Sequence, residues 1–425
     1  MHWFTQLFMV LVLLGTALRA WLNQRQVVAV RRHRDRVPEA FAARIDLASH
    51  HKAADYTVAR ARLGRWIMLF DTMILLLLTL GGGIDTIDQW WSLTGWPALW
   101  RGAAVILSII LLTSLLELPF SIYGTFGIEA RFGFNRITPR LFITDLLKGL
   151  LLSLALGLPL LFVVLLLMEK AGANWWWLTW IVFSLFSIFM QWLWPVAIAP
   201  LFNKFTPLAD ESLKQRLEAL LQRCGFTSQG VFVMDGSLRS SHGNAYFTGF
   251  GRSKRIVFFD TLIHPQEPEA TPPLQPAEVE AVLAHELGHF KLHHIRSGLL
   301  LSLVSSFVGL ALLGQLTAWP AFYQALGVSQ PSNHAALLLF MLALPVFTFF
   351  ATPLAAWWSR RHEFQADEFA ASVAQAGDLA AALVKLNRDN GSTLTPDPLH
   401  SAFYDSHPPT PIRVARLQQL AAART

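Results

Sequence analysis

Long apolar runs constrain this chain more than any other feature of its sequence. Of its 425 residues, 53% are hydrophobic and only 15% are charged. The charged residues avoid windows of about 20 residues, the length that crosses a bilayer. This pattern predicts a mainly α-helical, polytopic membrane protein with seven transmembrane helices. The seven runs lie at residues 4–22, 66–88, 101–125, 147–168, 175–199, 298–318 and 335–358.

The charges of the loops predict how the spans are oriented. Basic residues crowd the segment between the first two spans and the loop before the fourth, whereas residues 89–100 and 319–334 contain none. Because basic loops stay in the cytoplasm, we expect the N-terminus outside and the C-terminus inside. The net charge of +6 then belongs to loops beside membrane lipids, and binding of nucleic acid is not expected.

The spans divide the chain into four parts. Residues 1–199 hold the first five spans with their loops, and residues 298–358 hold the last two. Residues 200–297 and 359–425 are expected in the cytoplasm, where the helical hairpin of the last two spans brings them together. The first of these segments predicts an amphipathic helix at about 211–223, a small β-sheet, a turn at 249–254 and a proline-rich surface loop at 264–276.

The stretch "AVLAHELGHFKLHH", residues 281–294, carries a candidate metal site. It lies on a predicted helix that begins near Pro276 and continues into the sixth span. His285 and His289 are four positions apart and share one helical face, so that both imidazoles can bind one ion. Zinc suits two imidazoles, a carboxylate and an open fourth position. Glu286 would then act on the attacking water as a general base.

A third protein ligand is expected from the segment that follows the seventh span. In "SRRHEFQADEFAAS", residues 359–372, Glu363 and Asp367 are four apart on a predicted helix. We expect Glu363 to be the third zinc ligand, because the last two spans return it to the face that holds the histidines. Asp367 would hydrogen-bond a ligand imidazole and fix its tautomer. Glu368 is the rival carboxylate.

Other interpretations of these residues stay open at this point. The motif is also compatible with a polar interruption of a helix near the membrane, with solvated histidines. His293 and His294, just beyond it, are expected to be solvated or to support the ligands from outside. The only cysteine, Cys224, excludes a disulfide within the chain and a zinc site built on thiolates.

Several stretches together resemble the type I CAAX prenyl endopeptidases, integral-membrane zinc metalloproteases that trim the tail of prenylated proteins. In chain order they are "LPFSIYGTFGIEARFGFN", "PLFNKFTPL", "SSHGNAYFTGF", "KRIVFFDTLI", "AHELGHFKLHH", "EFQADEFA" and "SHPP". The resemblance implies that the seven helices surround a water-filled chamber. It also implies a cytoplasmic metalloprotease domain whose single catalytic zinc opens onto that chamber.

The resemblance implies roles for residues outside the metal motif as well. Asn244, Ala245 and Tyr246 match a strand edge that pairs with substrate backbone, a mode that recognises peptides without demanding particular side chains. His407, in "DSHPPTP", matches a histidine able to stabilise the oxyanion of the tetrahedral intermediate. Support for that region is implied for Arg413 or Arg416.

The expected function is that of a membrane-embedded zinc endopeptidase acting on peptides or proteins, lipid-modified tails included. After "HPP" the chain reads "TPIRVARL", where eukaryotic members usually continue with a leucine and an acidic "ER" pair, and arginine outnumbers lysine. These departures indicate a bacterial member in the inner membrane. The alternatives are a membrane quality-control metalloprotease of the heat-shock type and a non-enzymatic membrane scaffold with an incidental metal motif.

Overall fold

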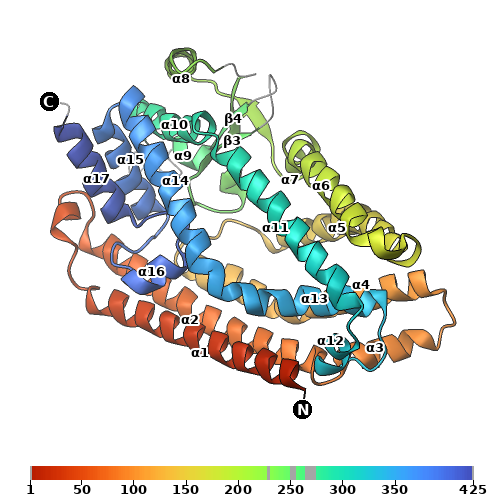
Figure 1. The fold of residues 1–425 in the computed structure, drawn as a ribbon. Coiled ribbons are helices and arrows are strands. Elements are labelled where there is room, and N and C mark those ends of the chain that lie inside the picture. Colours follow the sequence, from red (N-terminus) through yellow and green to blue (C-terminus); the bar gives the residue numbers. More distant parts are fainter. Residues whose placement is uncertain (1, 227–229, 249–254, 264–273, 424–425) are drawn as a thin grey trace.

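The computed structural model describes residues 2–226, 230–248, 255–263 and 274–423. The predicted turn at 249–254 and most of the predicted loop at 264–276 lie outside these residues. The chain is mainly helical, and long apolar helices form the larger part of it (Figure 1). A smaller part, with the only sheet among the described residues, lies at one end of these helices.

Among the described residues, six helical stretches are long and apolar enough to cross a membrane, and the number is seven if one bent pair of helices is counted as a span. This agrees with the seven predicted spans. The six stretches contain α1 (Trp3–Arg32), α4 (Ala98–Ile122), α5 (Pro139–Lys170), α6 (Trp175–Leu193), α11 (His294–Thr317), and α13 (Asn333–Thr348) with α14 (Thr352–Val373). α4 continues into a π-helical segment, Tyr123–Glu129, and α6 into another, Trp194–Ile198, followed by α7 (Ala199–Phe202).

The second predicted span is broken by glycines. α2 (Leu47–Leu78) and α3 (Gly83–Ser92) meet at an angle of 52°. Gly82 between them has φ of 74°, a left-handed conformation that glycine adopts without steric cost. A Cβ on Gly81 would lie 2.7 Å from the carbonyl oxygen of Leu77, so only glycine fits there. Residues 66–88 therefore do not form one straight helix.

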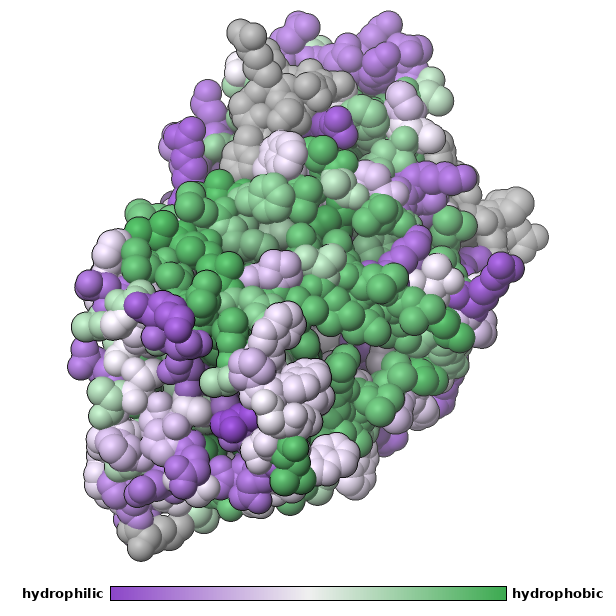
Figure 2. Space-filling model, turned by 90° about the vertical axis from the view of Figure 1, so that its right-hand side faces the viewer, coloured by the Kyte–Doolittle hydropathy of each residue, from purple (hydrophilic) through white to green (hydrophobic). Residues whose placement is uncertain are grey.

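The surface of the long helices is apolar. Figure 2 shows a broad hydrophobic band across one face, with hydrophilic side chains gathered toward the two ends. Leu151 of α5 and Leu185 of α6 are 67% and 63% exposed, and many other leucines and tryptophans of the long helices are exposed as well. An apolar surface of this size marks contact with a membrane or another protein, and the length and hydropathy of the helices beneath it indicate a membrane. The chain is a multi-pass integral membrane protein.

The small sheet has four strands in the order β1-β2-β4-β3. β2 and β4 are parallel, whereas β1 pairs antiparallel with β2, and β3 antiparallel with β4. β3 is therefore an edge strand among the described residues. The strands are β1 (Phe205–Pro207), β2 (Val231–Met234), β3 (Ala245–Thr248) and β4 (Arg255–Phe259).

Helices pack around this sheet to form a second hydrophobic core, separate from that of the membrane helices. Leu217, Phe258 and Leu283 are fully buried in it. Its helices include α8 (Glu211–Arg223), α9 (Asp260–Ile263), α10 (Pro276–Lys291), α15 (Ala376–Asp389) and α17 (Thr410–Ala422). Two short helices, α12 (Pro320–Ala325) and α16 (Pro398–Tyr404), lie elsewhere.

The helix that carries the metal motif starts as predicted but ends earlier. A capping box between Gln275 and Glu278 precedes α10, with Pro276 in its first turn. The helix does not continue into the sixth span, as the sequence had suggested, because His293 adopts a left-handed conformation with φ of 61°. α11 begins at the next residue, His294. Figure 1 shows that α10 lies with the sheet, whereas α11 runs down along the membrane helices.

The seventh span also changes direction before it reaches the smaller part. α13 ends at Thr348, a 3₁₀ turn occupies Phe349–Ala351, and α14 starts with Pro353 in its first turn. In Figure 1, α14 turns away from α13 and rises toward α10, α15 and α17. The C-terminal half of α14 therefore belongs to the part that holds the sheet.

Candidate metal centre

The candidate metal centre lies where α10 and α14 pack against each other. Gly288 stands at this contact, and a Cβ there would lie 3.0 Å from Cα of Ala366 and 3.2 Å from its carbonyl oxygen. A larger residue would push the two backbones apart. Glycine weakens the interior of a helix by about 1 kcal/mol, and here it allows a close approach in return. The motif helix and the helix after the seventh span thus meet, as predicted.

Three ligand-type side chains converge at this contact. His285 Nε2 lies 3.4 Å from Oε2 of Glu363, and His289 Nε2 lies 3.3 Å from Oε1 of the same carboxylate. The two Nε2 atoms are 3.3 Å apart. Among the described residues, these three form the one group of histidine, cysteine and carboxylate side chains with metal-ligand spacing.

The three side chains fit a tetrahedral metal ion. Ligand atoms at about 2.0–2.2 Å from zinc, at tetrahedral angles, stand roughly 3.3–3.6 Å from one another. The two Nε2 atoms are 3.3 Å apart, and each lies 3.3 to 3.4 Å from one oxygen of Glu363, so the separations fall in this range. Glu363 is 5% exposed, and its Oε2 atom has no hydrogen-bond partner of acceptable geometry. A buried carboxylate oxygen without a hydrogen bond is costly. The charge of Arg413 at 3.2 Å offsets part of this cost, and a metal ion bound to the oxygen would offset more.

Asp367 stands behind the first histidine. Its Oδ1 lies 2.9 Å from Nδ1 of His285, the contact that the sequence predicted for it. Arg413 of α17 binds both oxygens of the same carboxylate, with hydrogen bonds of 2.9 Å from Nε and 2.6 Å from Nη2. Arg413 Nη1 also lies 3.2 Å from Oε2 of Glu363. All of these side chains are buried.

Burial and neighbouring charges shift the pKa values of two side chains on α10, His285 and Glu286. Burial disfavours the protonated form of His285, but the hydrogen bonds to Asp367 and Glu363 outweigh this and raise its pKa to about 9. The carboxylates therefore favour positive charge at this position, which a metal cation also supplies. Burial raises the pKa of Glu286 above its ordinary value, although the two histidines oppose the shift. A raised pKa suits a carboxylate that must take up and release a proton near neutral pH.

The structure separates the remaining candidates near the site. His407 is exposed, and its Nε2 lies 3.4 Å from Oε1 of Glu363, so the structure brings it to the centre. Arg413 lies in the buried cluster, whereas Arg416 does not. Arg416 pairs with Glu368 at the surface, where both side chains are more than 40% exposed. The rival carboxylate Glu368 is therefore engaged away from the two histidines.

Sequence reasoning left one neighbour of the centre undecided. His293 is exposed, but His294 is buried, and its Nδ1 lies 3.0 Å from Nδ1 of His289. In a continuous helix, residues five positions apart do not share a face. The left-handed residue at 293 breaks the helix and makes the contact possible. No periodicity signal in the sequence could have shown it.

β3 contains two of the residues matched to substrate binding, Ala245 and Tyr246, and its outer edge has no partner strand among the described residues. Phe259 donates its backbone N–H to the carbonyl of Asn244, so this pair is hydrogen-bonded across the ladder. Antiparallel pairs alternate, and the backbone groups of Ala245 and Phe247 therefore point away from β4. The backbone of Tyr246 faces β4. The N–H of Ala245 is bonded to the Asn244 side chain at 2.8 Å.

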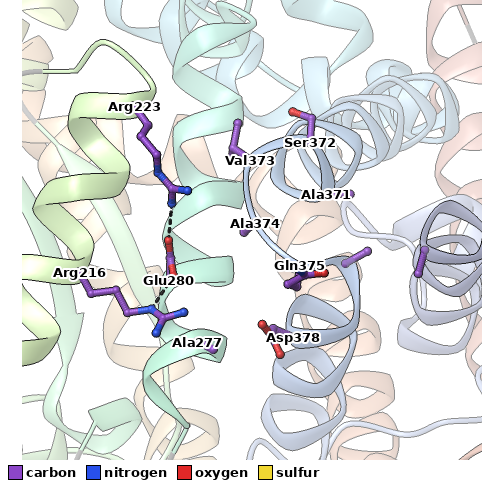
Figure 3. Close-up of a pocket in the computed structure, with 12 residues that line it drawn as sticks. Arg216, Arg223, Ala277, Glu280, Ala371, Ser372, Val373, Ala374, Gln375 and Asp378 are labelled. Atoms are coloured by element: carbon purple, nitrogen blue, oxygen red, sulfur yellow. Dashed lines mark hydrogen bonds and ion pairs between the residues drawn. The ribbon is translucent and has the colours of Figure 1, made fainter. Parts of the chain in front are cut away.

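A pocket of about 650 Å³ lies elsewhere in the same part of the chain (Figure 3). Residues of α8, α10, α15 and the end of α14 line it, and none of them belongs to the metal group. Arg216 and Arg223 of α8 both bind Glu280 of α10, at 2.5 Å each. These ion pairs fasten α8 to the motif helix and explain why Glu280 is buried.

A bundle of membrane helices that ends in a His–His–Glu group on two crossing helices, with His285 and Glu363 buried, indicates a membrane metallopeptidase. Family comparison supports this class. Residues 26–204 match the model described as CAAX prenyl protease N-terminal, five membrane helices, and residues 207–421 match peptidase family M48. The chain belongs to peptidase family M48 and, within it, to the type I CAAX prenyl endopeptidases.

Individual relatives are similar in sequence to this chain over most of their length. CAAX prenyl protease 1 of Saccharomyces cerevisiae is 31% identical, over 91% of this chain and 89% of that relative. A homolog of CAAX prenyl protease 1 from Arabidopsis thaliana is 40% identical, over 70% of this chain and 68% of its own length. The crystal structure of S. mikatae Ste24p superimposes with a TM-score of 0.86 at 29% identity, over 98% of this chain and 99% of that chain. The chain is a membrane metalloendopeptidase, and neither the heat-shock type nor a scaffold is favoured.

Arg413 and Arg416 provide a direct test of the buried charge cluster. Replacing Arg413 with Leu leaves Asp367 and Glu363 buried without their cation, so we expect a loss of about 3–5 kcal/mol of stability. Replacing Arg416 with Leu breaks an exposed pair worth about 0–1 kcal/mol. Thermal unfolding of both metal-free variants in the same detergent measures the difference. Equal melting temperatures for the two variants would contradict the assignment of Arg413.

Proposed function

We propose that this chain is a zinc endopeptidase whose single zinc ion is held by His285, His289 and Glu363. The observation that carries the proposal is the convergence of three ligand-type side chains, each with a ligand atom within 4.8 Å of the others. Two imidazoles, one carboxylate and an open position are the ligand set of catalytic zinc in peptidases. When bound, zinc would act as a Lewis acid that lowers the pKa of a water molecule and polarises the scissile carbonyl.

The residues of the chain would perform the remaining steps. Glu286 takes the proton from the attacking water and delivers it to the leaving amine. His407, at the exposed side of Glu363, donates a hydrogen bond to the oxyanion of the tetrahedral intermediate. Asp367 accepts the Nδ1 proton of His285, so that Nε2 of that ring keeps its lone pair for the metal. Arg413 holds Asp367 in place through two hydrogen bonds.

The substrate would bind as an added strand along β3. The outward backbone groups of Ala245 and Phe247 are the partners that an extended peptide needs, and such pairing does not depend on particular side chains. Asn244 and Tyr246 would contact the substrate strand through their side chains. The relatives are called CAAX prenyl proteases, so we propose a protein or peptide with a lipid-modified C-terminal tail as substrate. Membrane helices beside the protease part would accommodate the lipid.

The proposed orientation places the protease part in the cytoplasm. The positive charges of the segment after α1 and of the loop before α5 support an external N-terminus and an internal C-terminus. The arginine-rich composition and the sequence after "HPP" support a bacterial inner membrane. The division into residues 1–199, 200–297, 298–358 and 359–425 stays a prediction.

Glu363 and Glu368 offer a matched pair for the third ligand. We expect Glu363→Ala to weaken zinc binding by more than tenfold, because one of three protein ligands is lost. Glu368→Ala removes the exposed partner of Arg416 and should leave zinc binding unchanged. Competition of each detergent-solubilised protein with a fluorescent zinc chelator measures the affinity. Wild-type zinc affinity in Glu363→Ala would show that Glu363 is not the third ligand.

The Glu286→Gln variant separates metal binding from catalysis. The amide cannot accept the proton of the attacking water, so we expect about one zinc per chain and a fall in cleavage of roughly 10²- to 10⁴-fold. Zinc content by elemental analysis and cleavage of a farnesylated CAAX peptide and its unmodified counterpart are measured together. Glu211→Gln, at the exposed start of α8, is the control. Cleavage that survives Glu286→Gln, or that resists a chelator, contradicts the mechanism; equal cleavage of both peptides contradicts the lipid preference.

The edge-strand proposal is tested by proline at position 245. Ala245→Pro removes a backbone N–H that faces the free edge and makes no bond to β4. We expect kcat/KM to fall by about tenfold, the effect of one lost hydrogen bond. Ala245→Ser is the control, because it changes the same position with a small side chain and keeps the backbone N–H. An unchanged kcat/KM in a folded, zinc-loaded Ala245→Pro protein would show that the substrate does not use this edge.

A further inference from the structure

We propose that His294 is a positioning residue that fixes the tautomer and ring orientation of His289 through a hydrogen-bonded chain ending at Gln365. The inference rests on the proposed ligation of zinc by Nε2 of His289. Asp367 supports only the first of the two histidines, by its contact with His285. A ligand imidazole without a partner on its other nitrogen is free to rotate and to change tautomer.

The geometry supplies such a partner for His289. Its Nδ1 lies 3.0 Å from Nδ1 of His294, and Nε2 of His294 lies 3.0 Å from Oε1 of Gln365. His294 is 8% exposed. The three side chains come from α10, from the first residue of α11 and from α14, so the chain of hydrogen bonds crosses from the motif helix to the helix of Glu363.

The direction of every hydrogen bond follows from metal ligation. Nε2 of His289 offers its lone pair to the metal, so Nδ1 of that ring carries the proton and donates it. Nδ1 of His294 must then accept, which leaves the proton of His294 on Nε2. That proton is donated to Oε1, the side-chain amide oxygen, of Gln365. The three residues form one consistent arrangement, in which His294 is neutral and has a single allowed tautomer.

Packing holds the His294 ring in the required plane. His362 stacks on it with a centroid distance of 4.0 Å and an interplanar angle of 5°, and Trp358 lies 4.3 Å from the His362 ring. His362 and Trp358 both belong to α14. The left-handed conformation of His293 turns the chain so that His294 faces back toward α10. Stacking and hydrogen bonding therefore leave His294 little freedom to rotate.

Two substitutions at one position test whether the acceptor matters. His294→Phe keeps the ring and its stacking but has no acceptor, and we expect zinc affinity to fall by about 10- to 100-fold. His294→Asn places an amide oxygen near the position of Nδ1 and should stay within about threefold of wild type. His293→Asn is the matched control, because the side chain is exposed and asparagine tolerates the left-handed conformation. Zinc affinity is measured by chelator competition at one fixed pH, in detergent.

The outcomes separate this inference from the proposed function. Wild-type affinity in His294→Phe overturns it, and so does an equal loss in His294→Phe and His294→Asn, because that loss would reflect volume rather than the acceptor. If His294→Phe does not fold, Gln365→Leu decides, with a several-fold loss expected and an unchanged affinity overturning the proposal. His289→Ala is measured in parallel. If it keeps full zinc affinity, the proposed ligand set fails; if it loses zinc while His294→Phe does not, only the positioning role fails.

Discussion

The crossing of α10 and α14 is the contact on which the rest of the structure depends. A Cβ on Gly288 would lie 3.0 Å from Cα of Ala366, so glycine at this position lets α10 and α14 approach closely. This close approach places Glu363 beside both histidines. α14 reaches this place only because a short turn after α13 redirects it out of the membrane helices. The seventh span thus brings Glu363, the proposed third ligand, to the two histidines, and the membrane helices are part of the scaffold of the candidate site.

Burial of charge explains why further elements close around this crossing. A carboxylate taken out of water costs several kcal/mol unless cations or donors compensate it. Glu363 and Asp367 are both buried, and Arg413 of α17 serves both. Its guanidinium forms two hydrogen bonds with Asp367 and approaches Glu363, a geometry that lysine could not reproduce. The same buried charged side chains that would surround a metal ion therefore also hold α10, α14 and α17 together.

The sequence predicted those parts of the site that depend on helical periodicity and on topology. The spacing of His285 and His289 and the return of Glu363 by two spans required only a helix and a hairpin. The choice of Arg413 over Arg416 did not follow, because it depends on the rotation of α17 against α14. The sequence also did not predict the glycine break between α2 and α3, because a hydropathy run indicates the length of a span and not its direction. The directions of the helices depend on breaks in regular helix, which the apolar pattern does not show.

His293 shows what such a departure contributes. A left-handed conformation costs a residue other than glycine about 1–2 kcal/mol, and His293 is the only such residue in the described part of the chain. A continuous helix would avoid that cost but would turn His294 well away from His289. It would also direct the sixth span along the axis of α10. The break gives α11 its own direction in the membrane and places His294 against His289, a proposed ligand. One strained residue thus joins the geometry of the bundle to that of the metal centre.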